Sequence, residues 1–151
     1  MSLAICLASA PLTTYAQAKK AKSAAVTMNE TQKEKQQFAY GFYKTYMNSI
    51  IYPQLSDLST VIAKKFVSPK VLKKTADTGG DVLLDAQDCI EENVRTLQVV
   101  PINNDWFCVA FMWTSTYDKI PSQKKVIYIK VKQQGNSFII EDATSEKPKL
   151  T

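Results

Sequence analysis

The hydrophobic periodicity of this chain changes once, at Gly79-Gly80, and this change constrains the fold more than any other feature. Before the glycine pair, apolar residues recur every three or four positions, which is the spacing of an amphipathic helix. After the pair, apolar and polar residues tend to alternate, which is the period of a β-strand. Helices followed by an antiparallel meander predict an α+β domain, with N-terminal helices packed on a curved antiparallel sheet.

The apolar spacing before Gly79-Gly80 predicts one long helix and two shorter ones. Thr27-Met-Asn-Glu30 has the pattern of a capping box, and a helix from there to about Ile50 follows. The residues expected on one face of that helix are Ala39, Tyr43, Tyr46 and Ile50. A second helix is expected from Ser56 to Phe66. Ser68-Pro69, a cap followed by proline, opens a third helix that runs through Lys74.

The second half predicts the strands of a sheet. They are expected at Arg95 to Ile102, Trp106 to Trp113, Lys124 to Lys132 and Ser137 to Asp142. Asp81 to Asp85 predicts a brief strand or extended arm, and Asp85 to Asn93 a loop or a single turn. The segment from Trp106 to Trp113 is apolar on both faces, which is typical of a central strand covered on both sides. We therefore expect Trp113 to lie in the core.

The first eighteen residues carry no charged side chain. An apolar run from Leu3 to Leu12 is too short to span a bilayer as a helix. It is followed by the small-x-small site Ala16-Gln17-Ala18, and this pattern is typical of a secretory signal peptide. Cys6 does not fit a lipoprotein site, because Ile5 precedes it where a small residue is needed. A buried N-terminal helix is the alternative.

These boundaries divide the chain into four parts. Residues 1–18 form the signal peptide, 19–26 a flexible segment, 27–144 a single α+β domain, and 145–151 a polar tail. We expect an exported protein, located in the periplasm or outside the cell, with no transmembrane segment.

The charged residues exclude several classes of protein. The net charge is +5, but Arg95 is the one arginine, so 18 of the 19 basic residues are lysines. Nucleic-acid binders rely on arginine for bidentate contacts, so we expect no nucleic-acid partner. The sequence has no histidine, which excludes Ser-His-Asp and Cys-His catalysis and leaves only Cys89 and Cys108 as strong zinc ligands in the mature chain. We expect no metal, no cofactor and no enzymatic activity.

Two cysteines would remain after removal of the signal peptide, Cys89 and Cys108. In an exported protein they can form a disulfide. The alternative is two unlinked thiols, with Cys108 serving as a small core residue on a strand.

Carboxylates cluster after the glycine pair. They are Asp81, Asp85, Asp88, Glu91 and Glu92. Such a cluster can bind Ca²⁺ or raise the pKa of one of its members. Its spacing does not match an EF-hand loop. We favour the alternative in which the aspartates cap turns and the glutamates face solvent.

Aromatic side chains of the first helix and the central strand could line a ligand pocket. They are Phe38, Phe42, Tyr43, Tyr46, Trp106 and Trp113. The candidate pocket residues, carboxylates included, are Phe42, Tyr43, Tyr46, Asp85, Asp88 and Trp113. A helix packed directly on its sheet explains the same aromatics without a ligand.

Lysines crowd the second and third helices. They are Lys64, Lys65, Lys70, Lys73 and Lys74. Such a surface suits an acidic partner protein or an anionic envelope surface. A solvated helical face is the alternative.

Three loose motifs carry a resemblance to a known family. They are Phe38-x-x-x-Phe42-Tyr43-x-x-Tyr46, Asp81-x-x-x-Asp85-Ala-Gln-Asp88 and Gly135-Asn-Ser-Phe138-Ile-Ile140. With the order of elements, they resemble the nuclear-transport-factor-2-like superfamily and, within it, the exported proteins grouped as domain of unknown function 3828. The resemblance implies a cone-shaped fold and no particular activity. A Tyr–Asp pair over an apolar cavity serves enolising isomerases of similar fold, with Asp85 or Asp88 beside Tyr43 as the pair here.

The sequence therefore supports two hypotheses on function. The first is an exported, non-catalytic binding module of the cell envelope, with a small apolar ligand between the first helix and the sheet. The second is a surface-mediated protein-interaction role, such as an inhibitor or immunity-type protein. A hollow interior near Tyr43 favours the first hypothesis, and a filled interior favours the second.

Overall fold

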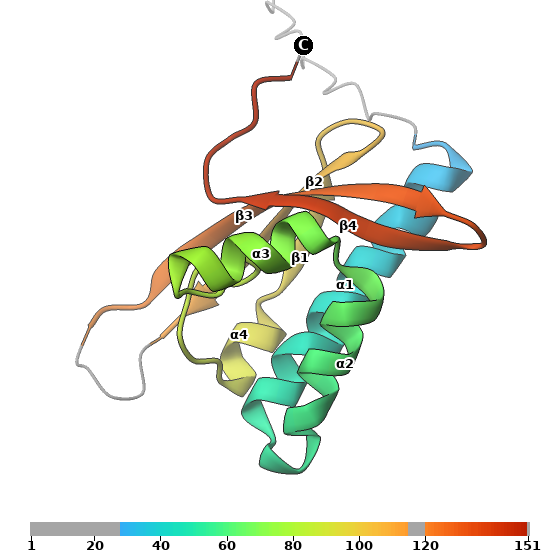
Figure 1. Ribbon diagram of the computed structural model, residues 1–151. Helices are drawn as coiled ribbons and strands as arrows, with labels where there is room; N and C mark the ends of the chain where they lie inside the picture. The colour runs from blue at the N-terminus through green and yellow to red at the C-terminus, as the bar shows by residue number, and fades with distance from the viewer. Residues whose placement is uncertain (1–27, 115–119, 151) are drawn as a thin grey trace, which may run out of the picture.

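The computed structural model describes residues 28–114 and 120–150. The helices come first and the strands last along the chain (Figure 1). The helical elements are α1 (Glu30–Ile51), the 3-10 turn η1 (Pro53–Leu55), α2 (Ser56–Phe66), α3 (Pro69–Thr78) and α4 (Glu91–Arg95). The strands are β1 (Gln98–Pro101), β2 (Trp106–Trp113), β3 (Gln123–Gln134) and β4 (Ser137–Thr144). The predicted signal peptide at residues 1–18, the predicted 19–26 segment, Thr27 of the predicted capping box and residue 151 lie outside these ranges.

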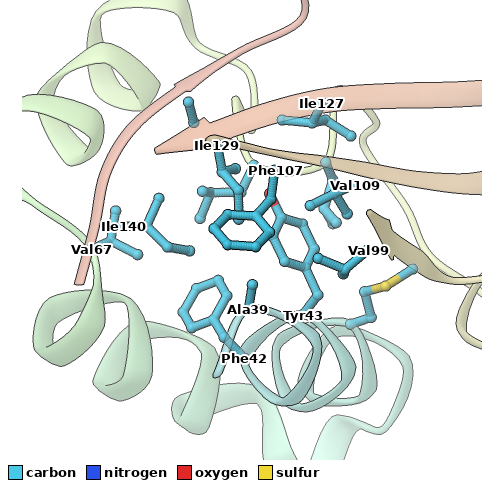
Figure 2. Packing of buried hydrophobic residues seen from close by; sticks show 14 of the residues in the cluster. Ala39, Phe42, Tyr43, Val67, Val99, Phe107, Val109, Ile127, Ile129 and Ile140 are labelled. Atoms are coloured by element: carbon cyan, nitrogen blue, oxygen red, sulfur yellow. The ribbon is translucent and has the colours of Figure 1, made fainter. Parts of the chain in front are cut away.

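The strands form one antiparallel sheet in the order β1-β2-β3-β4. Ile127, Ile129 and Val131 of β3 point to the same face and are fully buried, as strand alternation requires. Helices α1, α2 and α3 all contribute side chains to the core on that face. Figure 2 shows Phe107 and Ile129 of the sheet meeting Tyr43 of α1. The predicted α+β class, with helices packed on a curved antiparallel sheet, is confirmed.

A β-bulge sets which side chains of β4 face the core. The register shifts between Lys130 and Val131, so Glu141 is left without a direct partner residue on β3. Ile140 and Ala143, three positions apart, are therefore both fully buried. Glu141 instead lies on the outer face and forms ion pairs with Lys130 and Lys132.

The start and the buried face of α1 differ from the sequence prediction. The N-cap is Asn29, whose side chain accepts a hydrogen bond of 2.7 Å from the backbone N–H of Gln32. Asn and Thr are both good N-cap residues, and here the cap is Asn29, which directly precedes Glu30, the first residue of the helix. Ile50, predicted on the buried face, is 37 % exposed, whereas Met47 is fully buried. Met47 follows Tyr43 by four residues, which keeps it over the sheet as the helix turns.

β1 is shorter than predicted because a helical turn occupies its expected start. Asn93 in α4 is fully buried; its side chain accepts from the Ile90 N–H at 2.7 Å and donates to the Met112 carbonyl. These bonds join α4 to β2. The free edge of β1 is covered by Gln36, which donates a 2.7 Å hydrogen bond to the Val99 carbonyl.

The prediction that β2 is covered on both faces is wrong, although its bounds are as predicted. Phe107, Val109 and Phe111 face the core, but Trp106 and Cys108 on the other face are only half-buried. Among the described residues, the helices pack on one face of the sheet, and the other face is more open to solvent, although Ala110 on it is buried. Trp113, at the end of β2, is also half-buried and packs against the edge of the core rather than inside it.

Candidate functional site

The turn after α3 fixes the position of Asp81. α3 ends at Gly79, whose φ of 65° lies in the left-handed region that glycine favours. The Asp81 carboxylate accepts a 2.8 Å hydrogen bond from the Leu83 N–H, and its carbonyl accepts one of 2.8 Å from the Asp85 N–H. Leu83 and Leu84 are buried and hold the turn against the core. The strand or arm predicted from Asp81 to Asp85 is therefore wrong, because these hydrogen bonds close a turn.

The second oxygen of the Asp81 carboxylate accepts a 2.9 Å hydrogen bond from the Tyr46 hydroxyl. Burial raises the pKa of Asp81 above its ordinary value, although the hydrogen bonds from Leu83 and Tyr46 lower it in part. Burial and the nearby Asp81 charge raise the pKa of Tyr46. Tyr46 therefore remains a neutral hydrogen-bond donor at physiological pH.

Tyr43 lies one helical turn before Tyr46 and is fully buried. Its hydroxyl has no hydrogen-bond partner in the part of the chain that the structure describes. Burial, followed by the charges of Asp81 and Tyr46, raises its pKa well above the usual value. An unpartnered buried hydroxyl is uncommon and carries a desolvation penalty. It lies beside the Tyr46–Asp81 pair, so the pair has a second phenol within electrostatic range.

Asp81 lies in the wall of a hollow of about 390 Å³ at the end of α3, which we call the Asp81 cleft. The polar residues that line it are Lys74, Thr78, Asp81, Asp85, Gln87, Thr144 and Ser145. Thr78, Asp85 and Gln87 are exposed, so the cleft opens to solvent. A carboxylate with a perturbed pKa in a cleft is a common property of functional sites.

A series of polar contacts holds the other end of the Asp81–Asp85 turn, beginning at Asp85. Asp85 has a φ of 51°, a conformation that non-glycine residues adopt rarely. Its carboxylate pairs with Lys125 at 3.2 Å, and the Lys125 ammonium lies 5.4 Å from the centre of the Trp113 ring. Trp113 in turn donates a 2.8 Å hydrogen bond from Nε1 to Asp88. These contacts connect β2 and β3 to the turn.

The structure brings together part of the predicted pocket. Asp85, Asp88 and Trp113 form the chain of contacts just described, and Tyr46 lies at Asp81. Phe42 and Tyr43 instead lie in the filled interior between α1 and the sheet (Figure 2). The carboxylate that meets a tyrosine is Asp81, which sequence reasoning placed in the acidic cluster but not in the pocket. The Gly79-Gly80 pair before it signals a turn, but no sequence pattern gives its distance to Tyr46.

The acidic residues do not converge on one point. Each has its own partner: Asp81 binds Tyr46, Asp85 pairs with Lys125, and Asp88 accepts from Trp113. Glu91 accepts from the Tyr52 hydroxyl, and Glu92 pairs with Arg95. Among residues 28–114 and 120–150, no group of three or more such side chains could hold a metal ion.

Cys89 and Cys108 are free thiols. Cys89 belongs to the core cluster, whereas Cys108 lies on the outer face of β2. A core side chain and a side chain on the outer face of β2 lie on different sides of the sheet, whereas a disulfide needs closely spaced Cβ atoms. Burial, followed by the Asp88 charge, raises the pKa of Cys89 to about 12, so this thiol stays protonated.

The lysines of α2 and α3 divide into two groups. Lys70 pairs with Asp142 at 2.6 Å, and Lys74 donates a 2.9 Å hydrogen bond to the Ala143 carbonyl. Both tie α3 to β4. Lys64, Lys65 and Lys73 are exposed.

Comparison with known proteins identifies a fold and no activity. No protein-family model matches the chain, and no curated protein matches it. A solved structure of a protein of unknown function from Bacteroides thetaiotaomicron VPI-5482 is similar, with a TM-score of 0.64 and 24% sequence identity. The match covers 75% of this chain and 90% of that one. Within the described residues, no helix is long and apolar enough to cross a membrane.

Proposed function

We propose that this protein is a non-catalytic binding module whose ligand binds in the Asp81 cleft. The observation that carries the proposal is the partly buried Asp81 carboxylate in the wall of a hollow of about 390 Å³. An ionised carboxylate accepts hydrogen bonds and donates none, so it selects ligands with ammonium or hydroxyl groups. Lys74, Thr78 and Gln87 supply further polar contacts around it.

The proposed ligand site is the Asp81 cleft and not the space between α1 and the sheet. The sequence led us to expect a small apolar ligand between the first helix and the sheet. Tyr43, Met47 and Phe107 fill that space and are fully buried. The charged and hydroxyl side chains in the wall of the cleft, among them Asp81 and Thr78, instead favour a small ligand with polar groups.

The chemistry of the cleft supports binding rather than proton transfer. The chain has no histidine. The raised pKa of Tyr46 keeps its hydroxyl protonated, so it donates a hydrogen bond and does not act as a base. Asp81 already accepts from Leu83 and Tyr46, which holds the carboxylate in one orientation. A fixed acceptor in a solvent-open cleft suits recognition.

We also propose that the protein is exported to the cell envelope and that residues 1–18 are its signal peptide. The uncharged apolar run and the Ala16-Gln17-Ala18 site support this proposal. Intact-mass measurement of protein made in its native host tests it. A product starting at Lys19 is expected, and a full-length soluble product would contradict it.

We also propose that the protein belongs to the nuclear-transport-factor-2-like superfamily. Helices on one face of a curved antiparallel sheet support it. So do the three motifs described above, including the aromatic series of α1. The related proteins of domain of unknown function 3828 would then share the scaffold, while the ligand would depend on the residues of each cleft.

Ligand-observed NMR with a panel of small protonated amines, polyols and carboxylates tests the binding function. We expect amines or polyols to bind, and backbone resonances of Thr78, Asp81 and Gln87 to shift on binding. Asp81→Asn should abolish the shifts. Asp57→Asn, which removes an exposed carboxylate at the start of α2, is the matched control and should leave them unchanged.

Two outcomes would contradict the proposal. One is that no member of the panel shifts resonances at the cleft. The other is that binding persists unchanged in a folded Asp81→Asn variant. Circular dichroism of both variants establishes that they fold.

The filled interior also favours the second hypothesis, a surface-mediated interaction with another protein. The exposed Lys64, Lys65 and Lys73 are the basic surface such a partner would contact. Affinity capture by the wild type and by a Lys64→Glu, Lys65→Glu, Lys73→Glu triple variant tests this. A specific protein captured only by the wild type would support the interaction role.

A further inference from the structure

Gly41 leaves a gap in the outer surface of α1. It lies in the interior of a 22-residue helix, where glycine is less stable than alanine by about 0.5–1 kcal/mol. A Cβ atom added there would meet nothing within 4 Å, so packing does not require glycine. Gln37 and Thr45, four residues to either side, are exposed neighbours on the same row of the helix. The missing side chain therefore opens a space between them.

That space is part of an apolar groove of about 300 Å³ between α1 and α2. Its apolar walls are Phe38 and Phe42 from α1 and Ile62 and Phe66 from α2. The rings of Phe38 and Phe66 meet edge to face, with their centres 5.7 Å apart. The two helices lie side by side in Figure 1. The groove is therefore apolar, and aromatic rings form its wall on the side of the core.

A positive charge lies at this aromatic wall. The Lys65 ammonium is 5.1 Å from the centre of the Phe66 ring, and Lys65 is exposed and has no ion pair within the described residues. An apolar groove with an ammonium group beside its aromatic wall is complementary to a molecule with an apolar tail and an anionic head.

We propose that the groove at Gly41 binds a small anionic amphiphile, such as a medium-chain carboxylate. The tail lies between Phe42 and Ile62 over Gly41, and the head group lies at Lys65. This site differs from the Asp81 cleft in place and in chemistry, since its walls are apolar and its charge is positive. The proposal for this groove does not depend on the proposed function of the Asp81 cleft.

Isothermal titration calorimetry with decanoate, below its micelle concentration and at low salt, tests the proposal. We expect wild-type protein to bind decanoate at one site. Gly41→Leu, which places a side chain in the groove, should weaken binding at least about tenfold, as expected when about two methylene groups lose their burial. Lys65→Gln should weaken decanoate binding by about two- to fivefold and leave binding of decanol unchanged.

Thr31→Leu is the matched control, because it adds the same side chain to an exposed position of α1 away from the groove. It should bind decanoate like the wild type. Circular dichroism establishes that each variant folds. Failure of wild-type protein to bind, or equal binding by Gly41→Leu, would overturn the proposal. So would concentration-dependent dimerisation that Gly41→Leu abolishes, because the occupant would then be a second copy of the chain.

Discussion

The Tyr46 hydroxyl donates a 2.9 Å hydrogen bond to the Asp81 carboxylate, across 35 positions of sequence. The bond joins α1 to the turn after α3 and so fixes one wall of the Asp81 cleft. It also lowers the pKa of Asp81, against the larger effect of burial, which raises it. The pair therefore links the stability of the fold to the pH and to the proposed binding site.

We expect the Asp81 carboxyl to titrate above the ordinary range, and Tyr46→Phe to raise its pKa further. The reason is that the lost hydrogen bond favoured the ionised form. A raised pKa in the folded state means that the folded protein keeps a proton that the unfolded chain has released. Stability from this group is therefore highest at low pH and falls as pH rises through the raised pKa. Carboxyl-carbon NMR titration of both proteins measures it, and an unshifted Asp81 would contradict the prediction.

Tyr43→Phe and Tyr46→Phe remove the same atom and should have opposite effects. Tyr43 has an unpartnered buried hydroxyl, so its removal should be neutral or should stabilise the fold by up to about 1–2 kcal/mol. Tyr46→Phe removes a hydrogen bond to a charged group and should cost about 1–3 kcal/mol at neutral pH. Urea denaturation measures both. A loss of more than about 1 kcal/mol in Tyr43→Phe would instead indicate a buried water bound to this hydroxyl.

Asn93→Ala should cost about 2–4 kcal/mol, because it leaves the Ile90 N–H and the Met112 carbonyl without their partner. Asn93→Asp keeps an acceptor for Ile90 but places an oxygen against the Met112 carbonyl. Its destabilisation should be larger at neutral pH and should decrease on acidification, since a protonated carboxyl can donate again. Chemical denaturation at pH 7 and pH 4 distinguishes the two variants. Equal, pH-independent losses would show that the side chain only fills space.

Phe107→Ala should cost about 3–5 kcal/mol, the usual range for an aromatic side chain in a packed interior. Trp113→Ala should cost less, about 1–3 kcal/mol, because Trp113 is only half-buried. Trp113→Phe keeps an aromatic ring but loses the hydrogen bond to Asp88 and part of the packing of the indole, so its loss should be smaller than that of Trp113→Ala. Urea denaturation of the three variants gives the order, and a greater loss in Trp113→Ala than in Phe107→Ala would contradict it.

In a product that starts at Lys19, and so lacks Cys6, Cys89 and Cys108 should both react as thiols, with Cys108 faster in the folded protein. Cys108 is partly exposed, whereas burial raises the pKa of Cys89 to about 12. Reaction with a chromogenic disulfide reagent at pH 8, with and without denaturant, measures the two rates. Cys108→Ser should remove the faster phase. A product that shows neither thiol until it is reduced would reveal a Cys89–Cys108 disulfide.

The sequence by itself determined that the helices precede an antiparallel sheet. Helical spacing before Gly79-Gly80 and alternation after it are local patterns, so the bounds of α2 and β2 follow from neighbouring residues. The turn at Asp81 was missed because a short Val-Leu-Leu run fits both a strand and a buried turn. The side chain of Asp81 decides between them through a hydrogen bond to Leu83.

Only the tertiary structure decided which residues meet. Trp113 lies on the inner face of an apolar strand, but its burial depends on how far the core extends along β2, which no local pattern records. Asp81 rather than Asp85 or Asp88 meets Tyr46, because that pairing depends on how α3 crosses the sheet and where its C-terminal glycine turns the chain. Periodicity reports the local geometry of one segment, whereas a site is formed by side chains that the packing of several segments brings within hydrogen-bonding distance.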